Sequence, residues 1–298
     1  MSPIWLMLLS TLCLSFSSFF AKLLADVVVL NLLLLARLGI PAAIMLLFSH
    51  YQKARFPTFT ELKILLSRAV FIALAQLCFF IGLTQLSLIE IAVLFSTGPL
   101  FIPLIERLLY GKHISLFIAF ILCVSFFGVL IQSQILSGVE FRWALLIGVL
   151  SGFFNACSQV SMYNASKIKL KATMINGMTF LLALGICLPL IVFFPLPEQG
   201  ASEGVLLNNT SLFVGLTLLM GTLSVGTQLF RTKAYKKAAS TAELAPIFYL
   251  NLAIAAVLQV VFFDDVFTQM QIVGLLLISA ACLFYTLNKV VTLRQSKP

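Results

Sequence analysis

The sequence predicts an all-α polytopic membrane protein, with ten transmembrane helices arranged as two inverted repeats of five helices each. Composition, the spacing of apolar segments and the distribution of charge between loops predict this fold. Of the 298 residues, 61% are hydrophobic and 10% are charged, and the mean hydropathy is +1.11. Soluble domains average about 45–50% apolar and about 25% charged residues. The composition therefore argues against an ordinary soluble enzyme, a disordered chain and a disulfide-rich secreted scaffold.

Ten apolar segments divide the chain, and a helix needs about 20 residues to cross a bilayer. We expect the spans at residues 3–24, 28–48, 68–86, 88–109, 114–133, 142–164, 173–194, 211–234, 239–263 and 270–289. The linker after the second span carries Thr58 and Glu61 at the spacing of a capping box. In that motif the two side chains bind free N–H groups at a helix start, so the third helix should begin ahead of its span.

The loops alternate in their content of basic residues. With the amino terminus in the cytoplasm, the inner loops and the carboxyl tail hold most of the 19 Lys and Arg residues, among them Arg68 and Arg231. Cytoplasmic loops of membrane proteins are enriched in Lys and Arg, which also accounts for the net charge of +9. We therefore expect both termini in the cytoplasm, and we expect the membrane to be a bacterial inner membrane.

The fourth and ninth spans resemble each other. Each opens with small and acidic residues and has proline in its first half, Pro99 in one and Pro246 in the other. Each leads into a final apolar helix with a central glycine, Gly128 or Gly274, although two apolar helices with a proline can look alike by chance. Five spans per half is odd, so the halves would cross in opposite senses, as in many secondary transporters. The predicted organisation is a first repeat at 1–133, an external linker at 134–141, a second repeat at 142–289 and a cytoplasmic tail at 290–298.

Several short motifs resemble the EamA permeases of the drug/metabolite transporter superfamily. They are Leu35-Ala-Arg37-Leu in the second span, Gly98-Pro99-Leu100 in the fourth, and Ala234-Tyr235 followed by Ala245-Pro246 and Tyr249 near the ninth. The resemblance covers nearly the whole chain as two repeats. It implies a ten-helix exporter or importer of small metabolites. It implies no single substrate, because the family carries amino acids, nucleoside-like compounds and vitamins.

Arg37 lies near the centre of the second span. An arginine there costs about 2.5–3.5 kcal/mol on insertion scales, so it should face a partner or a wet cavity. One hypothesis is a cation that binds a carboxylate or phosphate of the substrate. The other is a structural anchor that fixes neighbouring helices, as buried ions often do.

Two acidic residues are candidates for coupling transport to a proton or cation gradient. Glu90 and Glu243 lie near opposite ends of the paired fourth and ninth helices, and either could equally be an interfacial carboxylate in water. Asn251 follows Glu243 on the same side of a helix, about 80° away. Pro99, Pro103 and Pro246 should kink these two helices, and a hinge in both halves is the functional hypothesis.

Small and polar residues form a stripe on one face of the sixth span. The stripe comprises Gly148, Ser151, Gly152, Asn155, Ser158, Gln159 and Met162. Such a stripe lines a cavity or allows close helix packing. The substrate-cavity candidates are Arg37, Asn155, Gln159, Asn176, Thr222, Glu243 and Asn251.

We expect a secondary transporter that moves a small polar metabolite, such as an amino acid or an amino-acid or nucleoside-like conjugate, by alternating access. An intramembrane enzyme that modifies a lipid or metabolite, and a membrane scaffold or channel subunit, are the alternatives. The sequence has no P-loop, HExxH, GxSxG or CxxC motif, so no catalytic residue, metal or cofactor is expected. The expected partners are a small-molecule substrate and the lipid bilayer, not nucleic acid, and homodimerisation is left open.

Overall fold

Each of the ten predicted spans contains helix in the computed structural model. The structure describes residues 1–25, 30–83, 85–86, 88–111, 113, 115–133, 143–193, 210–263 and 268–295. The first half contains α1 (Pro3–Ala25), α2 (Leu30–Tyr51), α3 (Phe59–Leu83), α4 (Leu88–Phe95), α5 (Gly98–Tyr110) and α6 (Leu116–Ser133). The second half contains α7 (Trp143–Ser166), α8 (Ala172–Phe193), α10 (Thr210–Lys237), the 3₁₀ helix η2 (Ala242–Tyr249), α11 (Leu250–Phe263) and α12 (Gln269–Gln295).

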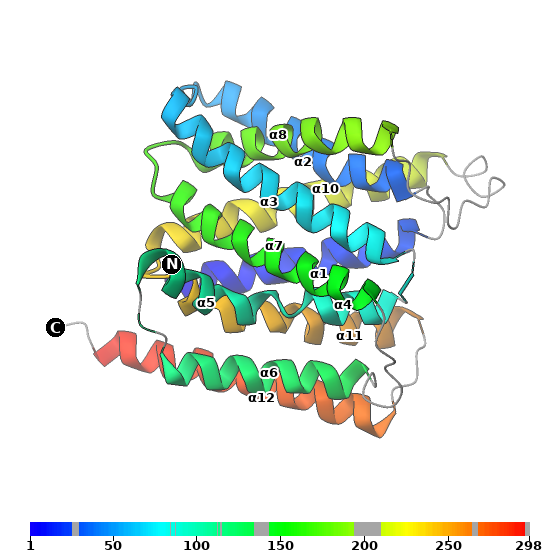
Figure 1. Cartoon of the computed structure of the whole chain (residues 1–298), viewed down its shortest axis with the longest axis vertical. Helices are drawn as coiled ribbons and strands as arrows, with labels where there is room; N and C mark the ends of the chain where they lie inside the picture. Colours follow the sequence, from blue (N-terminus) through cyan, green and yellow to red (C-terminus); the bar gives the residue numbers. More distant parts are fainter. Residues whose placement is uncertain are drawn as a thin grey trace.

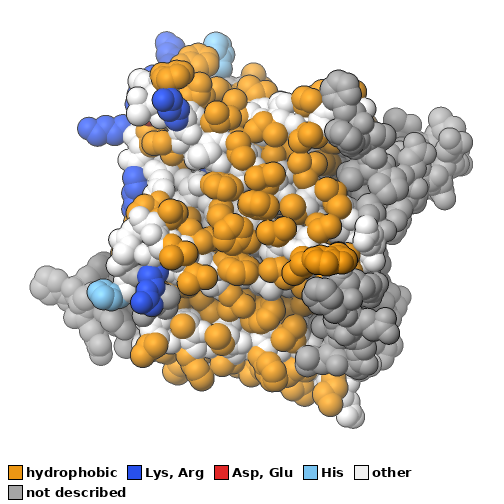
Figure 2. Space-filling model, viewed as in Figure 1, with side chains coloured by type: hydrophobic (Ala, Val, Ile, Leu, Met, Phe, Trp, Pro, Cys, Tyr) orange, Lys and Arg blue, Asp and Glu red, His pale blue; other side chains and the backbone are white. Residues whose placement is uncertain are grey.

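The apolar helices have the dimensions of a membrane protein. Eight helices of the described chain are long and apolar enough to cross a bilayer, and two shorter apolar stretches, Leu116–Ile131 and Ala242–Ala255, complete the set. Figure 2 shows a broad apolar surface across the face in view, with Lys and Arg gathered at one end of it. Both termini lie at that same end in Figure 1. The protein is therefore an integral membrane protein of the predicted all-α class.

The predicted capping box starts α3 early. The Thr58 N–H donates to Glu61 Oε2 at 2.8 Å, and the Glu61 N–H donates to Thr58 Oγ1 at 3.5 Å. These contacts satisfy N–H groups that a helix start leaves free, so α3 begins at Phe59 rather than at residue 68. As a result, residues 59–67, which precede the predicted third span, belong to α3.

Helix pairing follows an inverted repeat. Helix α1 packs against α10, and α3 packs against α7. In the repeat, α1 corresponds to α7 and α3 corresponds to α10. Each of these two contacts is therefore the repeat-related copy of the other. The remaining major pairs, α2 with α8 and α6 with α12, each join a helix to its own counterpart (Figure 1). At the α6–α12 contact a Cβ on Gly128 would lie 3.0 Å from the Gly274 carbonyl oxygen. The two glycines that the sequence singled out thus let these counterpart helices approach closely.

The fourth span is interrupted, and the ninth changes from 3₁₀ to α-helical geometry. The fourth span divides at Ser96 and Thr97 into α4 and α5, of 8 and 13 residues, and the ninth into η2 and α11, of 8 and 14 residues. Pro99 occupies the first turn of α5, where its missing N–H is not needed, and Pro246 lies within the 3₁₀ segment. The departures from regular α-helix expected near these two prolines are confirmed. Pro103, in contrast, lies inside the continuous helix α5.

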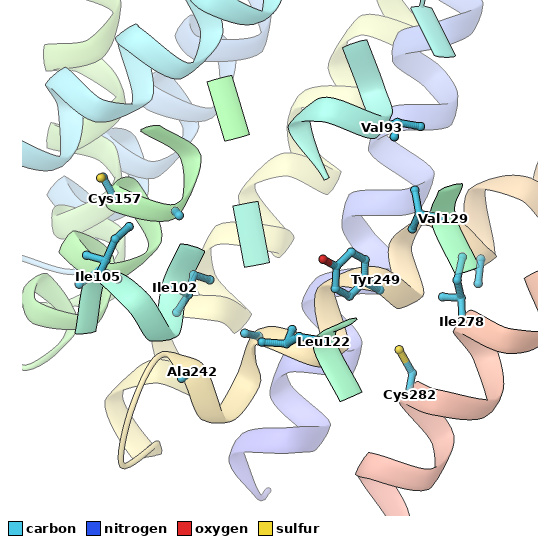
Figure 3. Close-up of a cluster of buried hydrophobic side chains, with 14 residues drawn as sticks. Val93, Ile102, Ile105, Leu122, Val129, Cys157, Ala242, Tyr249, Ile278 and Cys282 are labelled. Carbon is cyan, nitrogen blue, oxygen red and sulfur yellow. The ribbon is translucent and has the colours of Figure 1, made fainter. Parts of the chain in front are cut away.

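A core of buried side chains surrounds these two spans. Figure 3 shows Tyr249, the last residue of η2, in a cluster with Ile102, Leu122 and Ile278. These residues come from α5, α6, η2 and α12, so both halves contribute. The core holds the junction of η2 and α11 against the α6–α12 pair.

Candidate functional site

Arg68 is buried in a polar network between α3, α8 and α10. Its side chain is 1% exposed, Nη1 donates to Asn176 Oδ1 at 2.9 Å, and Nη2 donates to Gln228 Oε1 at 3.0 Å. Asn176 in turn donates to Thr232 Oγ1 at 2.7 Å. The assignment of Arg68 to an inner loop was therefore wrong, because α3 begins at Phe59 and carries the residue into the bundle.

A second buried arginine, Arg231, lies on α10. Its side chain is 5% exposed, its Nε donates to Ser10 Oγ at 3.3 Å, and its guanidinium lies 4.9 Å from the centre of the Phe248 ring. The charge count also assigned this arginine to an inner loop, although the predicted span 211–234 includes it; that assignment is wrong, because Arg231 lies inside α10 and is buried. Arg68 and Arg231 are near enough to interact electrostatically, and Tyr235 is near enough to interact with both.

The two guanidinium groups retain unsatisfied donors. Arg68 Nε and Arg231 Nη2 are buried without a hydrogen-bond partner. Within the described chain neither arginine forms an ion pair, since the salt bridge found there joins Arg55 to Glu61. A buried cation solvated only by neutral oxygens favours an incoming anion, because the desolvation cost has already been met by the fold.

The polar stripe of α7 reaches this network at one point and packs closely at another. Tyr235 donates to Gln159 Oε1 at 3.2 Å, and Gln159 Nε2 lies 3.4 Å from Asn155 Oδ1. At the other end of the stripe, a Cβ on Gly152 would lie 2.8 Å from the Leu94 carbonyl oxygen, next to the interruption between α4 and α5. Both hypotheses for the stripe therefore hold in part. Its glycine allows close helix packing, and its amide side chains belong to the polar network.

Arg37 is not part of the network. It lies on α2 with a partly exposed side chain, and among the described residues it has no hydrogen-bond or ion-pair partner. A structural anchor would need such a partner. The hypothesis that Arg37 serves a wet cavity stays a prediction.

Glu243 caps a helix start. Its Oε2 accepts a hydrogen bond from the Ala239 N–H at 3.0 Å, and its own N–H donates to Ser240 Oγ at 3.1 Å. The arrangement resembles a capping box at the start of η2, with the carboxylate bound to the N–H of the residue before Ser240. The coupling hypothesis for Glu243 now competes with this structural role. The side chain of Glu90 lies outside the described residues.

Glu106, which the sequence did not single out, joins the two halves. Its side chain is 2% exposed, and its two carboxylate oxygens accept hydrogen bonds from the Thr241 N–H at 2.8 Å and the Ala242 N–H at 3.1 Å. A carboxylate at a helix start is favoured by the free N–H groups and by the helix dipole. Glu106 on α5 thus holds η2 of the second half in place.

The remaining candidates make separate contacts. Asn251 Oδ1 accepts a hydrogen bond from Ser15 Oγ at 2.8 Å, which ties α11 to α1. Thr222 is exposed, and its hydroxyl donates to Leu218 and Leu219 of its own helix. Neither joins the network around Arg68. The structure brings together Asn155, Gln159 and Asn176 from the predicted set, and adds Arg68, Arg231 and Tyr235.

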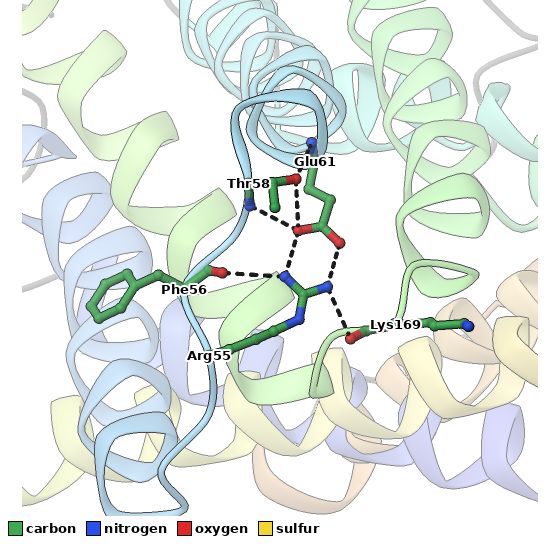
Figure 4. A network of polar contacts seen from close by, with 5 residues as sticks. All are labelled: Arg55, Phe56, Thr58, Glu61 and Lys169. Carbon is green, nitrogen blue, oxygen red and sulfur yellow. Dashed lines mark hydrogen bonds and ion pairs between the residues drawn. The ribbon is translucent and has the colours of Figure 1, made fainter.

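Ionic and polar contacts link the halves at the end that carries the termini. Figure 4 shows Arg55 bound through both Nη atoms to Glu61, at 2.8 and 2.6 Å, while Arg55 Nη2 also donates to the Lys169 carbonyl at 3.3 Å. Hydrogen bonding to Glu61 raises the pKa of the Arg55 guanidinium, so the pair remains charged. Lys171 Nζ donates to the Gln52 carbonyl at 2.6 Å, a second link between the halves. Together with the contacts of Glu106, these hydrogen bonds join the two halves at this end.

The comparisons with known proteins agree with this architecture. The sequence model of the EamA-like transporter family matches residues 1–134 and 142–287. No curated protein sequence matched the chain. Among 28 matching chains of solved structures is one described only as "Crystal structure of protein", with a TM-score of 0.74 and 13% sequence identity over 99% of both chains. At that identity the likeness shows the fold alone.

Proposed function

The chain belongs to the EamA-like transporter family, and we propose that it is a secondary transporter that moves a small anionic or zwitterionic metabolite by alternating access. Amino acids and amino-acid or nucleoside-like conjugates have the required carboxylate or phosphate. The observation that carries this proposal is the pair of buried arginines, Arg68 and Arg231, without an ion-pair partner among the described residues.

The energetics of the pair support a ligand. Each buried donor without a partner costs about 1–3 kcal/mol, and Arg68 Nε and Arg231 Nη2 are two such donors. A carboxylate or phosphate could accept from both, and a guanidinium binds such groups through parallel hydrogen bonds. The neutral side chains of Asn176, Gln159 and Tyr235 would then orient the polar remainder of the metabolite.

Alternating access requires one end of the bundle to open while the other closes. We propose that the contacts of Glu106 with the start of η2 and of Arg55 with the Lys169 carbonyl form part of the gate at the end that carries the termini. Both contacts join the first half to the second. The break between α4 and α5 and the change of helix type between η2 and α11 are the proposed hinges, because a continuous α-helix bends less easily.

We further propose that this end faces the cytoplasm of a bacterial cell. The termini lie there (Figure 1), and Lys and Arg gather there (Figure 2), as the positive-inside rule requires. A cysteine introduced at His50 should react with an impermeant thiol reagent only after the inner face is made accessible. Reaction in intact cells would show the opposite orientation, with this end outside the cell.

Reconstitution in liposomes tests the function. Purified protein should catalyse saturable counterflow, in which unlabelled internal metabolite drives uptake of the labelled form, and empty liposomes should show none. Counterflow requires a binding site that alternates between the two faces, so it separates a transporter from a channel. Linear, non-saturating flux would support a channel instead, and conversion of the metabolite without translocation would support an enzyme.

A further inference from the structure

A basic hollow of about 660 Å³ opens at the end that carries the termini. It lies between the end of α2, the turn from α7 to α8, and the last turns of α10. Four lysines contribute to its lining, Lys169, Lys171, Lys233 and Lys236, and among the described residues that line it there is no Asp or Glu. This hollow, with its four lysines, is the basic pocket.

Three of the four lysines are available to a ligand. Lys171 Nζ already donates a hydrogen bond to the Gln52 carbonyl, which also lines the pocket. The side chains of Lys169, Lys233 and Lys236 are exposed and have no hydrogen-bond or ion-pair partner within the described chain. Several cations around one concave surface, without a compensating carboxylate, produce a positive potential that attracts anions.

The start of α8 adds a second feature that suits an anion. Helix α8 begins at Ala172, and the first N–H groups of a helix have no partner within it. Thr173, which also lines the pocket, is 7% exposed, and its hydroxyl is buried without a hydrogen-bond partner. A buried hydroxyl left unpaired destabilises a fold unless a ligand completes its hydrogen bonds.

Another part of the lining is apolar. Phe48, Leu170, Ile175 and Leu229 contribute to the pocket, and Phe48 belongs to the exposed apolar surface of α2 together with its neighbour Leu47. A free phosphate ion gains nothing from an apolar surface, because it has no apolar part to bury. An amphiphile does gain, because its charged headgroup can bind the lysines while its acyl chains lie along the apolar surface and extend into the bilayer.

We propose that the basic pocket binds the phosphate headgroup of an anionic phospholipid from the adjacent leaflet. Basic pockets between helices on the cytoplasmic side are a recurrent means of lipid recognition. The pocket touches the proposed substrate network at the buried side chain of Thr232, whereas its lysines and Thr173 lie outside that network. Lipid binding is therefore independent of which metabolite is carried, and of whether transport occurs at all.

Native mass spectrometry of the purified full-length chain tests the proposal, with phosphatidylglycerol, phosphatidylcholine and inorganic phosphate as probes. The pocket variant is Lys233→Gln/Lys236→Gln. The matched control is Lys63→Gln/Arg107→Gln, which removes the same charge from exposed residues on α3 and α5 outside the pocket. Thermal unfolding in detergent without added lipid checks that each variant is folded.

The wild-type protein should bind phosphatidylglycerol more tightly than phosphatidylcholine. The pocket variant should bind phosphatidylglycerol about 30-fold more weakly, from the usual contribution of a lysine near an anionic lipid surface, and the control should be unchanged. Thr173→Val, which keeps the shape and removes the hydroxyl, should weaken binding about 10-fold.

Three results would overturn the proposal. An equal loss in the control would mean that general surface charge attracts the lipid. Equal affinity for phosphatidylcholine would mean that the headgroup is not recognised. Displacement of phosphatidylglycerol by millimolar inorganic phosphate, with the same dependence on Lys233 and Lys236, would assign the pocket to a soluble anion.

Discussion

Replacing Arg68 by methionine separates a structural role from a role in binding substrate. The change removes two hydrogen bonds, to Asn176 at 2.9 Å and to Gln228 at 3.0 Å, and leaves both acceptor oxygens without their donor. Hydrogen bonds to charged groups contribute about 1.5–3 kcal/mol each, so the loss amounts to about 3–6 kcal/mol. The same change removes a buried charge, whose desolvation costs several kcal/mol. The two effects nearly cancel, and we expect Arg68→Met to alter the free energy of unfolding by less than about 2 kcal/mol.

Transport should respond much more strongly than stability. Without the guanidinium, the carboxylate or phosphate of the substrate loses a charge-assisted partner in a site shielded from water. We expect counterflow by Arg68→Met to fall by at least about 100-fold, the equivalent of about 2.7 kcal/mol. Arg68→Lys keeps the charge but cannot reach both Asn176 and Gln228, so its counterflow should be intermediate.

The assay pairs thermal unfolding in detergent with counterflow in liposomes, on the same preparations. Thr222→Val is the control, since this exposed hydroxyl bonds only to its own helix. The reasoning is refuted if Arg68→Met loses more than about 3 kcal/mol of stability while its folded fraction transports normally. Arg68 would then be a structural anchor.

Three further substitutions test the proposed gate, the coupling of transport to a proton gradient, and the role of Arg37. Glu106→Gln should lower the free energy of unfolding by about 1.5–3 kcal/mol, because an amide nitrogen cannot accept from the start of η2; an unchanged thermal unfolding temperature would contradict this. Glu243→Gln keeps the cap, since glutamine also serves in a capping box, so fold and counterflow should persist. Accumulation driven by a proton gradient should disappear in that variant, and its survival would remove Glu243 from coupling. Arg37→Lys should fold normally but take up substrate about 10-fold more slowly, because lysine cannot bind a carboxylate through two parallel hydrogen bonds; normal uptake would place Arg37 outside the cavity.

The fold was predictable because bilayer thickness and hydropathy fix the spans. Proline and the Thr58–Glu61 capping box also act locally, so the irregular helix geometry near Pro99 and Pro246 and the early start of α3 could be read from neighbouring residues. The central glycines Gly128 and Gly274 were recognisable for the same reason. Each of these signals lies within one helix and needs no knowledge of its neighbours.

The buried arginines were missed because they lie at the ends of the predicted spans 68–86 and 211–234, among basic residues that the charge count assigned to the inner loops. Helices α3 and α10 extend past those ends, so Arg68 and Arg231 lie inside the bundle. Glu106 was missed for a different reason. Its partners, the N–H groups of Thr241 and Ala242, are distant in the sequence, and only tertiary packing brings them together.

The charge selectivity of counterflow shows whether Arg68 and Arg231 bind the anionic group of the substrate. For any amino acid or conjugate that the reconstituted protein carries, the matched probe is its amide, which has nearly the same size and shape but no carboxylate charge. We predict that the wild-type protein carries the acid at least about 100-fold better than the amide, and that Arg68→Met abolishes most of this difference. Equal transport of acid and amide by the wild-type protein would contradict the claim that Arg68 and Arg231 hold the anionic group of the substrate.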